Sequence, residues 1–238
     1  MSEWWAYRPG DFLMFAPRTY WRLFELHNQA SWPAPWLLGL AGLAALWLLW
    51  RRPASWRVLA LGLAMAWAGV GWYFLQGRYA AVFWVMHWWA WAFLAQALLL
   101  LALVASPALK AVPAGPRRRG GLLLLAWAVL GQPMLAVLAG RPMMQAEIIG
   151  LAPDPTVIAT FGLLLCTAPA SGAWRCLWWT SWLVATGWCA LSAATLWTMG
   201  SSQGWVPAIA ALCALVLRLR CRPGPGEAAG LAVPPARG

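Results

Sequence analysis

Seven long apolar segments, none of which contains Asp, Glu, Lys or Arg, follow one another along this chain with short connections between them. They are residues 33–50, 58–76, 79–104, 121–139, 156–170, 176–199 and 205–217. A membrane-crossing helix needs about 20 predominantly apolar residues, whereas a soluble domain carries about 25% charged residues. Because this chain is 63% hydrophobic and only 10% charged, we expect an all-α polytopic integral membrane protein with seven transmembrane helices.

The first apolar segment is preceded by a more polar stretch, residues 1–32. Within it, residues 17–30 place charged side chains such as Arg22 and Glu25 on one helical face and apolar side chains on the others, which predicts an interfacial amphipathic helix. We therefore divide the chain into this outer segment, a seven-helix domain over residues 33–220, and a tail. The tail, residues 221–238, is rich in Pro and Gly and is expected to be disordered in the cytoplasm.

The charged residues give the expected orientation, because short loops rich in Lys and Arg stay in the cytoplasm. If alternate connections face opposite sides, one side carries five basic residues and five acids, and the other carries twelve basic residues and one acid. Those twelve are Arg51, Arg52, Arg57, Lys110, Arg117, Arg118, Arg119, Arg175, Arg218, Arg220, Arg222 and Arg237. We expect a bacterial inner-membrane protein with its amino terminus outside and its carboxyl terminus in the cytoplasm. The net charge of +11 thus indicates topology, and nucleic acid is not an expected partner.

Two of the apolar segments have similar edges. Pro33-Ala34-Pro35 opens the first and Pro153-Asp154-Pro155 opens the fifth. One interpretation is a parallel repeat, in which segments one to three and five to seven are copies joined by the fourth, as in some small transporters. The other is coincidence in a chain rich in Pro, Ala and Trp.

Catalytic and metal-binding patterns are absent from the sequence. We find no nucleophile elbow, phosphate loop or His-rich zinc pattern, and the apolar segments contain no charged residue that could serve as a proton relay. The five cysteines form no Cys-x-x-Cys pair and are read as reduced core residues. We expect no catalytic site, no metal site and no resident cofactor.

The polar residues inside the apolar segments are His87, Gln96 and Gln132, among others. The glutamines are expected to form interhelical hydrogen bonds or to contact a solute. His87 is expected to be a structural, hydrogen-bonded histidine, with a bis-histidine haem shared with His27 as the alternative.

The longest polar connection between apolar segments contains Arg141, Glu147 and Asp154. Asp154 lies between two prolines ahead of an apolar helix, which predicts a helix cap. Glu147 lies in the apolar sequence QAEIIGL and has no such explanation, so it is expected to pair with Arg141 or Arg78. We expect these residues, together with Glu25 and His27, to form a vestibule at the outer face.

Three stretches carry a resemblance to a known family: FELHNQASWP (residues 24–33), AWAGVGWYF (66–74) and LAPDPTVIATFGLLL (151–165). On these residues the chain resembles an uncharacterised family of bacterial multi-pass membrane proteins, a domain of unknown function. The resemblance implies a membrane location and a shared fold, and it supplies no activity.

The expected function is binding or permeation of a small solute, with the lipid bilayer as the surrounding partner. Two alternatives stay open. The first is a membrane scaffold or accessory subunit that transports nothing, and the second is a protein that binds haem or another hydrophobic cofactor. The sequence does not indicate the oligomeric state.

Overall fold

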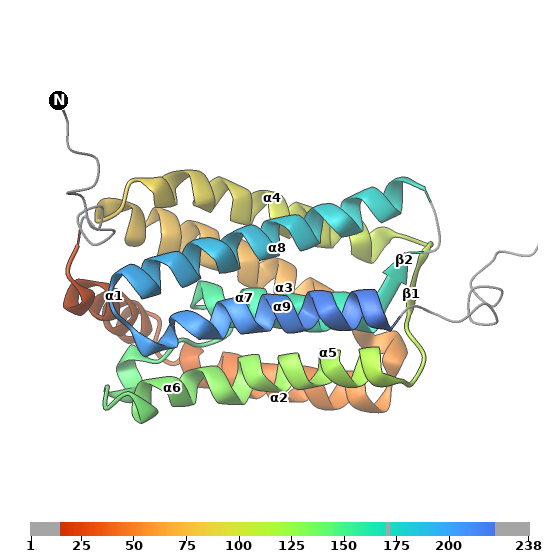
Figure 1. Cartoon of the computed structure of the whole chain (residues 1–238), viewed down its shortest axis with the longest axis horizontal. Coiled ribbons are helices and arrows are strands. Elements are labelled where there is room, and N and C mark those ends of the chain that lie inside the picture. The colour runs from red at the N-terminus through yellow and green to blue at the C-terminus, as the bar shows by residue number, and fades with distance from the viewer. Residues whose placement is uncertain (1–14, 170–171, 222–238) are drawn as a thin grey trace, which may run out of the picture.

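Long helices lie side by side in the computed structural model, which describes residues 15–169 and 172–221 (Figure 1). The α-helices are α1 (Pro17–Ala30), α2 (Ala34–Arg51), α3 (Trp56–Gly69), α4 (Val85–Ala105), α5 (Pro116–Ala126), α6 (Gln132–Leu138), α7 (Pro153–Cys166), α8 (Ala173–Thr198) and α9 (Trp205–Arg220). Two π-helical stretches, η4 (Val70–Gln76) and η6 (Trp127–Gly131), continue α3 and join α5 to α6. Short 3-10 turns are η3 (Pro53–Ser55), η5 (Tyr79–Ala81), η7 (Met143–Gln145) and η8 (Ser202–Gly204).

The helical fold class is confirmed, with several helices apolar enough to cross a membrane. In the described part of the chain, length and composition single out five: residues 34–51, 53–81, 85–105, 116–138 and 202–220. α7 has 14 residues and is therefore about 21 Å long, which is less than the roughly 30 Å of a bilayer core. The count of seven spans is thus not confirmed by helix length alone.

Two predicted segments, the third and the fifth, had wrong boundaries. Residues 79–104 are not one helix, because η5 turns the chain before α4 begins; the turn buries Tyr79 against the rings of Tyr20 and Phe74. The fifth helix begins at Pro153 rather than at Thr156, since the first helical turn does not need the amide that proline lacks. It ends at Cys166, where the chain becomes strand β2 (Thr167–Pro169). β2 pairs antiparallel with β1 (Leu109–Ala111), a pairing that the helical pattern did not predict.

α7 is the central element of the fold. All fourteen of its residues are buried, and it packs against α3, α5, α8 and α9. Asp154 lies in its first turn, and Arg117 donates hydrogen bonds to the carbonyls of Leu164 and Thr167 at its other end. The helix dipole favours an anion at the first position and a cation at the second.

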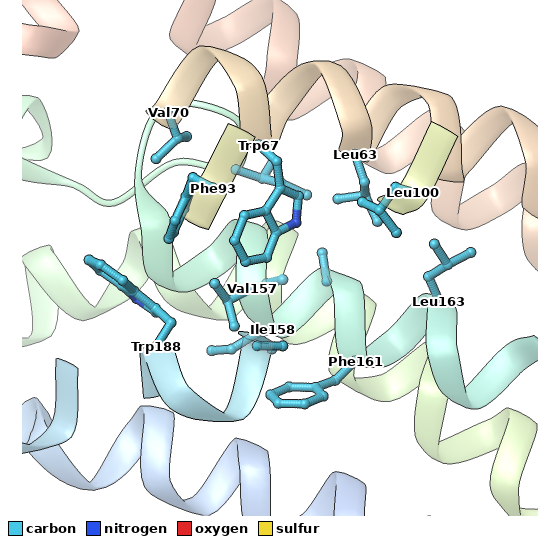
Figure 2. Packing of buried hydrophobic residues seen from close by; sticks show 14 of the residues in the cluster. Leu63, Trp67, Val70, Phe93, Leu100, Val157, Ile158, Phe161, Leu163 and Trp188 are labelled. Atoms are coloured by element: carbon cyan, nitrogen blue, oxygen red, sulfur yellow. The ribbon is translucent and has the colours of Figure 1, made fainter. Parts of the chain in front are cut away.

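Aromatic side chains fill the space between α7 and its neighbours (Figure 2). Trp67 of α3 lies 4.1 Å from Phe93 of α4, measured between ring centroids, and donates a 2.8 Å hydrogen bond to Thr160 of α7. Phe93 in turn lies 4.9 Å from Trp188 of α8. These contacts join α3 to α7 directly and connect α4 and α8 to α3 through Phe93.

α5 approaches α7 closely through two glycines. A Cβ atom on Gly121 would lie 2.7 Å from the carbonyl oxygen of Gly162, and a Cβ on Gly162 would lie 2.7 Å from the carbonyl oxygen of Gly121. Both positions therefore require glycine. Packing through small residues is the usual way for helices to approach closely in a membrane.

The amphipathic pattern of α1 is confirmed. Its buried residues are Tyr20, Leu23, Phe24, His27 and Asn28, and Phe24 stacks on Phe74 of η4 at 4.8 Å. Arg18, Arg22 and Gln29 are exposed. α1 lies across one end of the long helices (Figure 1).

The domain division and the repeat stay predictions. In the proposed repeat α2 would correspond to α7, yet α2 exposes half of its residues and α7 exposes none. Residues 222–238, most of the predicted disordered tail, lie outside the described residues.

Candidate functional site

The loop between α6 and α7, residues 139–152, carries the predicted vestibule residues Arg141 and Glu147. α6 ends in a Schellman motif, in which the amides of Gly140 and Arg141 bond to the carbonyls of Val137 and Ala136. Gly140 has a φ of +69°, which other residues rarely adopt. At the far end of the loop, the Thr156 hydroxyl accepts a hydrogen bond from the amide of Gly150 and donates one to the carbonyl of Ala152.

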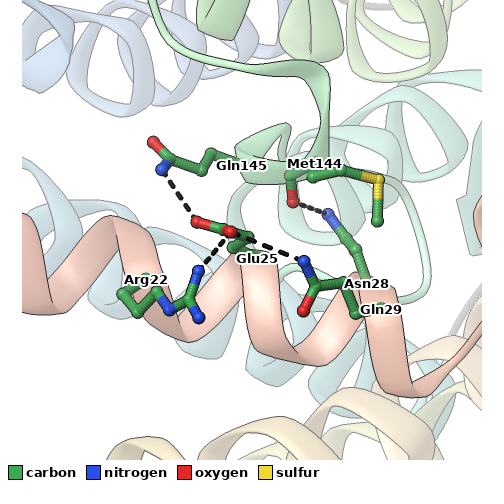
Figure 3. Close-up of polar contacts among 6 residues, drawn as sticks. All are labelled: Arg22, Glu25, Asn28, Gln29, Met144 and Gln145. Carbon is green, nitrogen blue, oxygen red and sulfur yellow. Dashed lines mark hydrogen bonds and ion pairs between the residues drawn. The ribbon is translucent and has the colours of Figure 1, made fainter.

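α1 covers this loop and is hydrogen-bonded to it (Figure 3). Asn28 donates from its side-chain amide to the carbonyls of Met144 and Ala146, both at 2.9 Å. Glu25 accepts a 3.0 Å hydrogen bond from Gln145 and forms the expected ion pair with Arg22. The hydrogen bond from Gln145 and that from Arg22 lower the pKa of Glu25. Glu25 is therefore a charged residue that joins α1 to the loop and lies outside the pair of buried carboxylates.

Glu147 belongs to the same loop and is buried, with 4% of its surface exposed. Its Oε2 accepts a 2.6 Å hydrogen bond from Nε2 of Gln132, whereas Oε1 is buried and has no hydrogen-bond partner within residues 15–169 and 172–221. Burial, and then the charge of Asp154, raise the pKa of Glu147 above the usual range of a carboxyl group. The Glu147 side chain is thus arranged to hold a proton or to contact a cation.

Asp154 is also buried, and its role differs from the expected helix cap. Oδ1 accepts a 2.7 Å hydrogen bond from the indole of Trp188, and Oδ2 accepts one of 2.7 Å from the hydroxyl of Ser192. No side chain caps the start of α7. Both oxygens of the carboxylate instead accept hydrogen bonds from α8. The carboxylate therefore does not accept a hydrogen bond from the first amides of α7.

Arg141 does not pair with Glu147 as expected. Its guanidinium donates a 2.8 Å hydrogen bond to the side-chain oxygen of Gln203 and lies 3.4 Å from the ring centroid of Trp21. Burial lowers the pKa of Arg141, and the charge of Glu147 acts in the opposite direction. The hydrogen bonds of Arg141 therefore go to η8, through Gln203, and to the loop itself, through the carbonyl of Gln145.

The two histidines each have a different partner. Nε of Arg78 donates a 3.2 Å hydrogen bond to Nδ1 of the buried His27, so Arg78 does not pair with Glu147 either. Burial, followed by the charge of Arg78, lowers the pKa of His27 to about 4. His87 is exposed and lies 2.9 Å from Oε1 of Gln76.

Gln96 lies in the middle of α4 and is fully buried. Neither polar atom of its amide has a hydrogen-bond partner in the part of the chain that the structure describes. The same holds for the indole nitrogen of Trp182 on α8. The structure therefore does not join Gln96 to Gln132 and Glu147 by hydrogen bonds.

Several residues of the site were missed by sequence reasoning. Trp188 and Ser192 lie one helical turn apart on α8, a spacing that puts both on one face, but nothing in the sequence connected that face with Asp154. Gln203, Gln145 and Asn28 looked like ordinary polar residues in a turn, a loop and a helix. Their roles follow from α1 and η8 meeting the loop, which is a tertiary contact.

No group of three or more His, Cys, Asp or Glu residues is arranged to hold a metal ion within the described ranges. The carboxylates of Glu147 and Asp154 can accept a proton or a cation, whereas the indole of Trp188 is only a hydrogen-bond donor.

A family model matches residues 18–223, and its description is a family of unknown function, DUF6064. The chain belongs to this family. The DUF6064 match runs from α1 to just beyond α9, so it includes both carboxylates and every side chain that bonds to them. No curated protein and no solved structure matches the chain.

Proposed function

We propose that this DUF6064 protein is a multi-pass membrane protein that binds a small cation at Glu147 and Asp154. The observation that carries the proposal is the buried Oε1 of Glu147, which has no hydrogen-bond partner in the described residues. The charge of a second buried carboxylate, Asp154, also acts on this group. Burying a carboxylate without a compensating partner is costly. A cation or a proton at this position offsets that cost.

The orientation proposed here follows the charge distribution. The end of the bundle that carries α1 and the loop faces outward, and the end that carries β1 and β2 faces the cytoplasm of a bacterial inner membrane. The site then lies at the outer end of the bundle, and α7 runs inward from it. Reporter tags at the two termini test this orientation, and a cytoplasmic amino terminus would contradict it.

Binding is favoured over permeation by the packing beneath the site. Trp67, Phe93 and Trp188 fill the space between α7 and its neighbours (Figure 2), so a solute that reached Glu147 would meet closely packed rings further in. The same filled core supports the second candidate, a membrane scaffold or accessory subunit in which the carboxylates hold only a proton.

Thermal unfolding of the detergent-purified protein distinguishes these functions. The chloride salts of sodium, potassium, calcium and methylammonium are compared at constant ionic strength. We expect one cation to raise the melting temperature of the native protein, and more so at higher pH because the cation competes with a proton. Glu147→Gln should abolish the shift. Glu25→Gln, which removes an acid at the same end of the bundle but outside the buried pair, should preserve it. A shift that survives in Glu147→Gln would overturn the proposal, and no shift with any salt would favour the scaffold.

A further inference from the structure

A second site is suggested at the opposite end of the bundle, by a groove of about 630 Å³ between α2 and α5. Its lining is almost entirely apolar and consists of Leu43, Leu46, Trp47, Trp50, Arg119, Leu122, Leu123 and Ala126. On each helix the lining covers a run of eight residues, so the groove extends for about 10 Å along the helix axes. That length fits within one leaflet of a bilayer core of about 30 Å.

Guanidinium groups gather at one end of this groove. Arg119 is itself part of the lining and is exposed. Arg51 lies over Trp47 and Trp50, with Cζ 5.8 and 5.2 Å from their ring centroids. Arg118 donates 3.0 Å hydrogen bonds to the carbonyls of Leu49 and Trp50, which fixes the first turn of α5 beside the last turn of α2.

The positive charge at this end has no acidic counterpart nearby in the sequence. The chain contains no Asp or Glu between Glu25 and Glu147, whereas Arg51, Arg52 and Arg117 to Arg119, at the end of α2 and the start of α5, all lie in that interval. An external anion is therefore the natural counterion for the head of the groove, since each basic residue near an anionic membrane surface contributes about 1 kcal/mol.

A neighbouring groove provides an internal comparison. It measures about 470 Å³, lies between α5 and α9, and is lined by Gly120, Leu123, Leu124, Trp127, Val206, Ile209, Ala210, Cys213 and Leu217. This second lining is as apolar as the first but includes no basic residue. Shape and hydrophobicity alone would thus favour an acyl chain in both grooves, and charge distinguishes the first.

We infer that the groove between α2 and α5 binds an anionic phospholipid. One acyl chain lies along Leu43, Leu46 and Leu123, and the phosphate group is held at the level of Arg119. Trp47 and Trp50 lie at the boundary between chain and headgroup, where tryptophan is favoured. The inference rests on the membrane location in the proposed function and is independent of cation binding at Glu147.

Native mass spectrometry of the protein released from nanodiscs tests this site. The nanodiscs contain equal amounts of phosphatidylglycerol and phosphatidylcholine, and the lipid retained by the protein is counted. We expect the native protein to retain phosphatidylglycerol in preference to phosphatidylcholine. Arg119→Gln should lower that preference about fivefold, which corresponds to the roughly 1 kcal/mol of one basic residue. Arg119→Lys should restore most of it. Arg175→Gln, which removes an exposed arginine on α8 outside the groove, should leave it unchanged.

Equal retention of the two lipids by the native protein would overturn the phospholipid site, as would a preference that Arg119→Gln leaves intact. Extraction of cell membranes with alkaline carbonate separates this failure from failure of the proposed location. A protein released by carbonate is not integral to the membrane, and that result would overturn both proposals. A protein that stays in the membrane without lipid preference would overturn the phospholipid site alone.

Discussion

Gln132 donates a 2.6 Å hydrogen bond to one oxygen of Glu147, while the other oxygen of the same carboxylate is buried with no partner in the described residues. Gln132 is the first residue of α6, whereas Glu147 lies in the loop that follows α6, and Pro133 lies directly after Gln132. Proline has no amide hydrogen to donate within the helix. The π-helical stretch η6 ends at Gly131, directly before Gln132. The glutamine that supports the site therefore lies at an interruption of the helix.

Glu147→Gln is expected to stabilise the protein at neutral and higher pH. The pKa of Glu147 is raised in the folded state, so the folded protein retains a proton that the unfolded chain releases. The protonated Glu147 side chain therefore contributes its full stability below the ordinary pKa of glutamate. This contribution is lost as the pH rises through the pKa of Glu147 in the folded state. The free energy of unfolding of the variant should exceed that of the native protein by on the order of 1–3 kcal/mol near pH 9, and should differ little from it near pH 4.

Chemical denaturation at several pH values measures this gain. Glu25→Gln is the matched control, and its stability relative to the native protein should not increase with pH. If Glu147→Gln loses stability at every pH, the carboxylate is a structural acceptor rather than a strained group.

Asp154→Ala is expected to lower stability by about 2–4 kcal/mol, because it leaves the indole of Trp188 and the hydroxyl of Ser192 buried without an acceptor. Ser192→Ala removes only one of these bonds and should cost about 1 kcal/mol. Thermal unfolding with near-ultraviolet circular dichroism reports both the stability and the environment of the indole. A native-like melting temperature for Asp154→Ala would show that these hydrogen bonds contribute little.

His27 makes the stability depend on pH in the opposite sense to Glu147. Its folded pKa is lowered to about 4 by burial and by Arg78, so it binds a proton more readily in the unfolded chain. The stability it contributes is present above about pH 6.5 and is lost as pH falls towards 4. His27→Gln should reduce that loss. Titration of the imidazole by nuclear magnetic resonance gives the pKa directly, and Arg78→Gln should move it back towards 6.5.

Gly121→Ala is expected to destabilise the contact between α5 and α7 by about 1–3 kcal/mol, because the added Cβ meets the carbonyl of Gly162 at 2.7 Å. Alanine gains up to about 1 kcal/mol in helix propensity over glycine, and this gain is too small to compensate. Gly62→Ala is the control, since nothing lies within 4 Å of a Cβ there, and it should be neutral or stabilising in the same thermal assay. Equal effects of the two substitutions would contradict the close approach.

Much of the fold was predictable from the sequence, because an apolar helix is specified by local composition. The amphipathic face of α1 and the pairing of Arg22 with Glu25 follow from spacings of three and four residues. The partners of Asp154 and Arg141 were not predictable, since Trp188, Ser192 and Gln203 approach them only when α8 and η8 pack against α7 and the loop. A proline at the first helical position suggested a cap, but burial of Asp154 between helices determined its hydrogen bonds.

The central claim is that Glu147 holds a proton which a small cation displaces. Infrared difference spectroscopy of the reconstituted protein, recorded before and after addition of the cation that gave the largest thermal shift, measures this directly. The account predicts that the carbonyl band of a protonated carboxyl group disappears when the cation binds, and that Glu147→Gln shows no such change. A band that persists in the presence of the cation, or a change that is the same in Glu147→Gln, would contradict it.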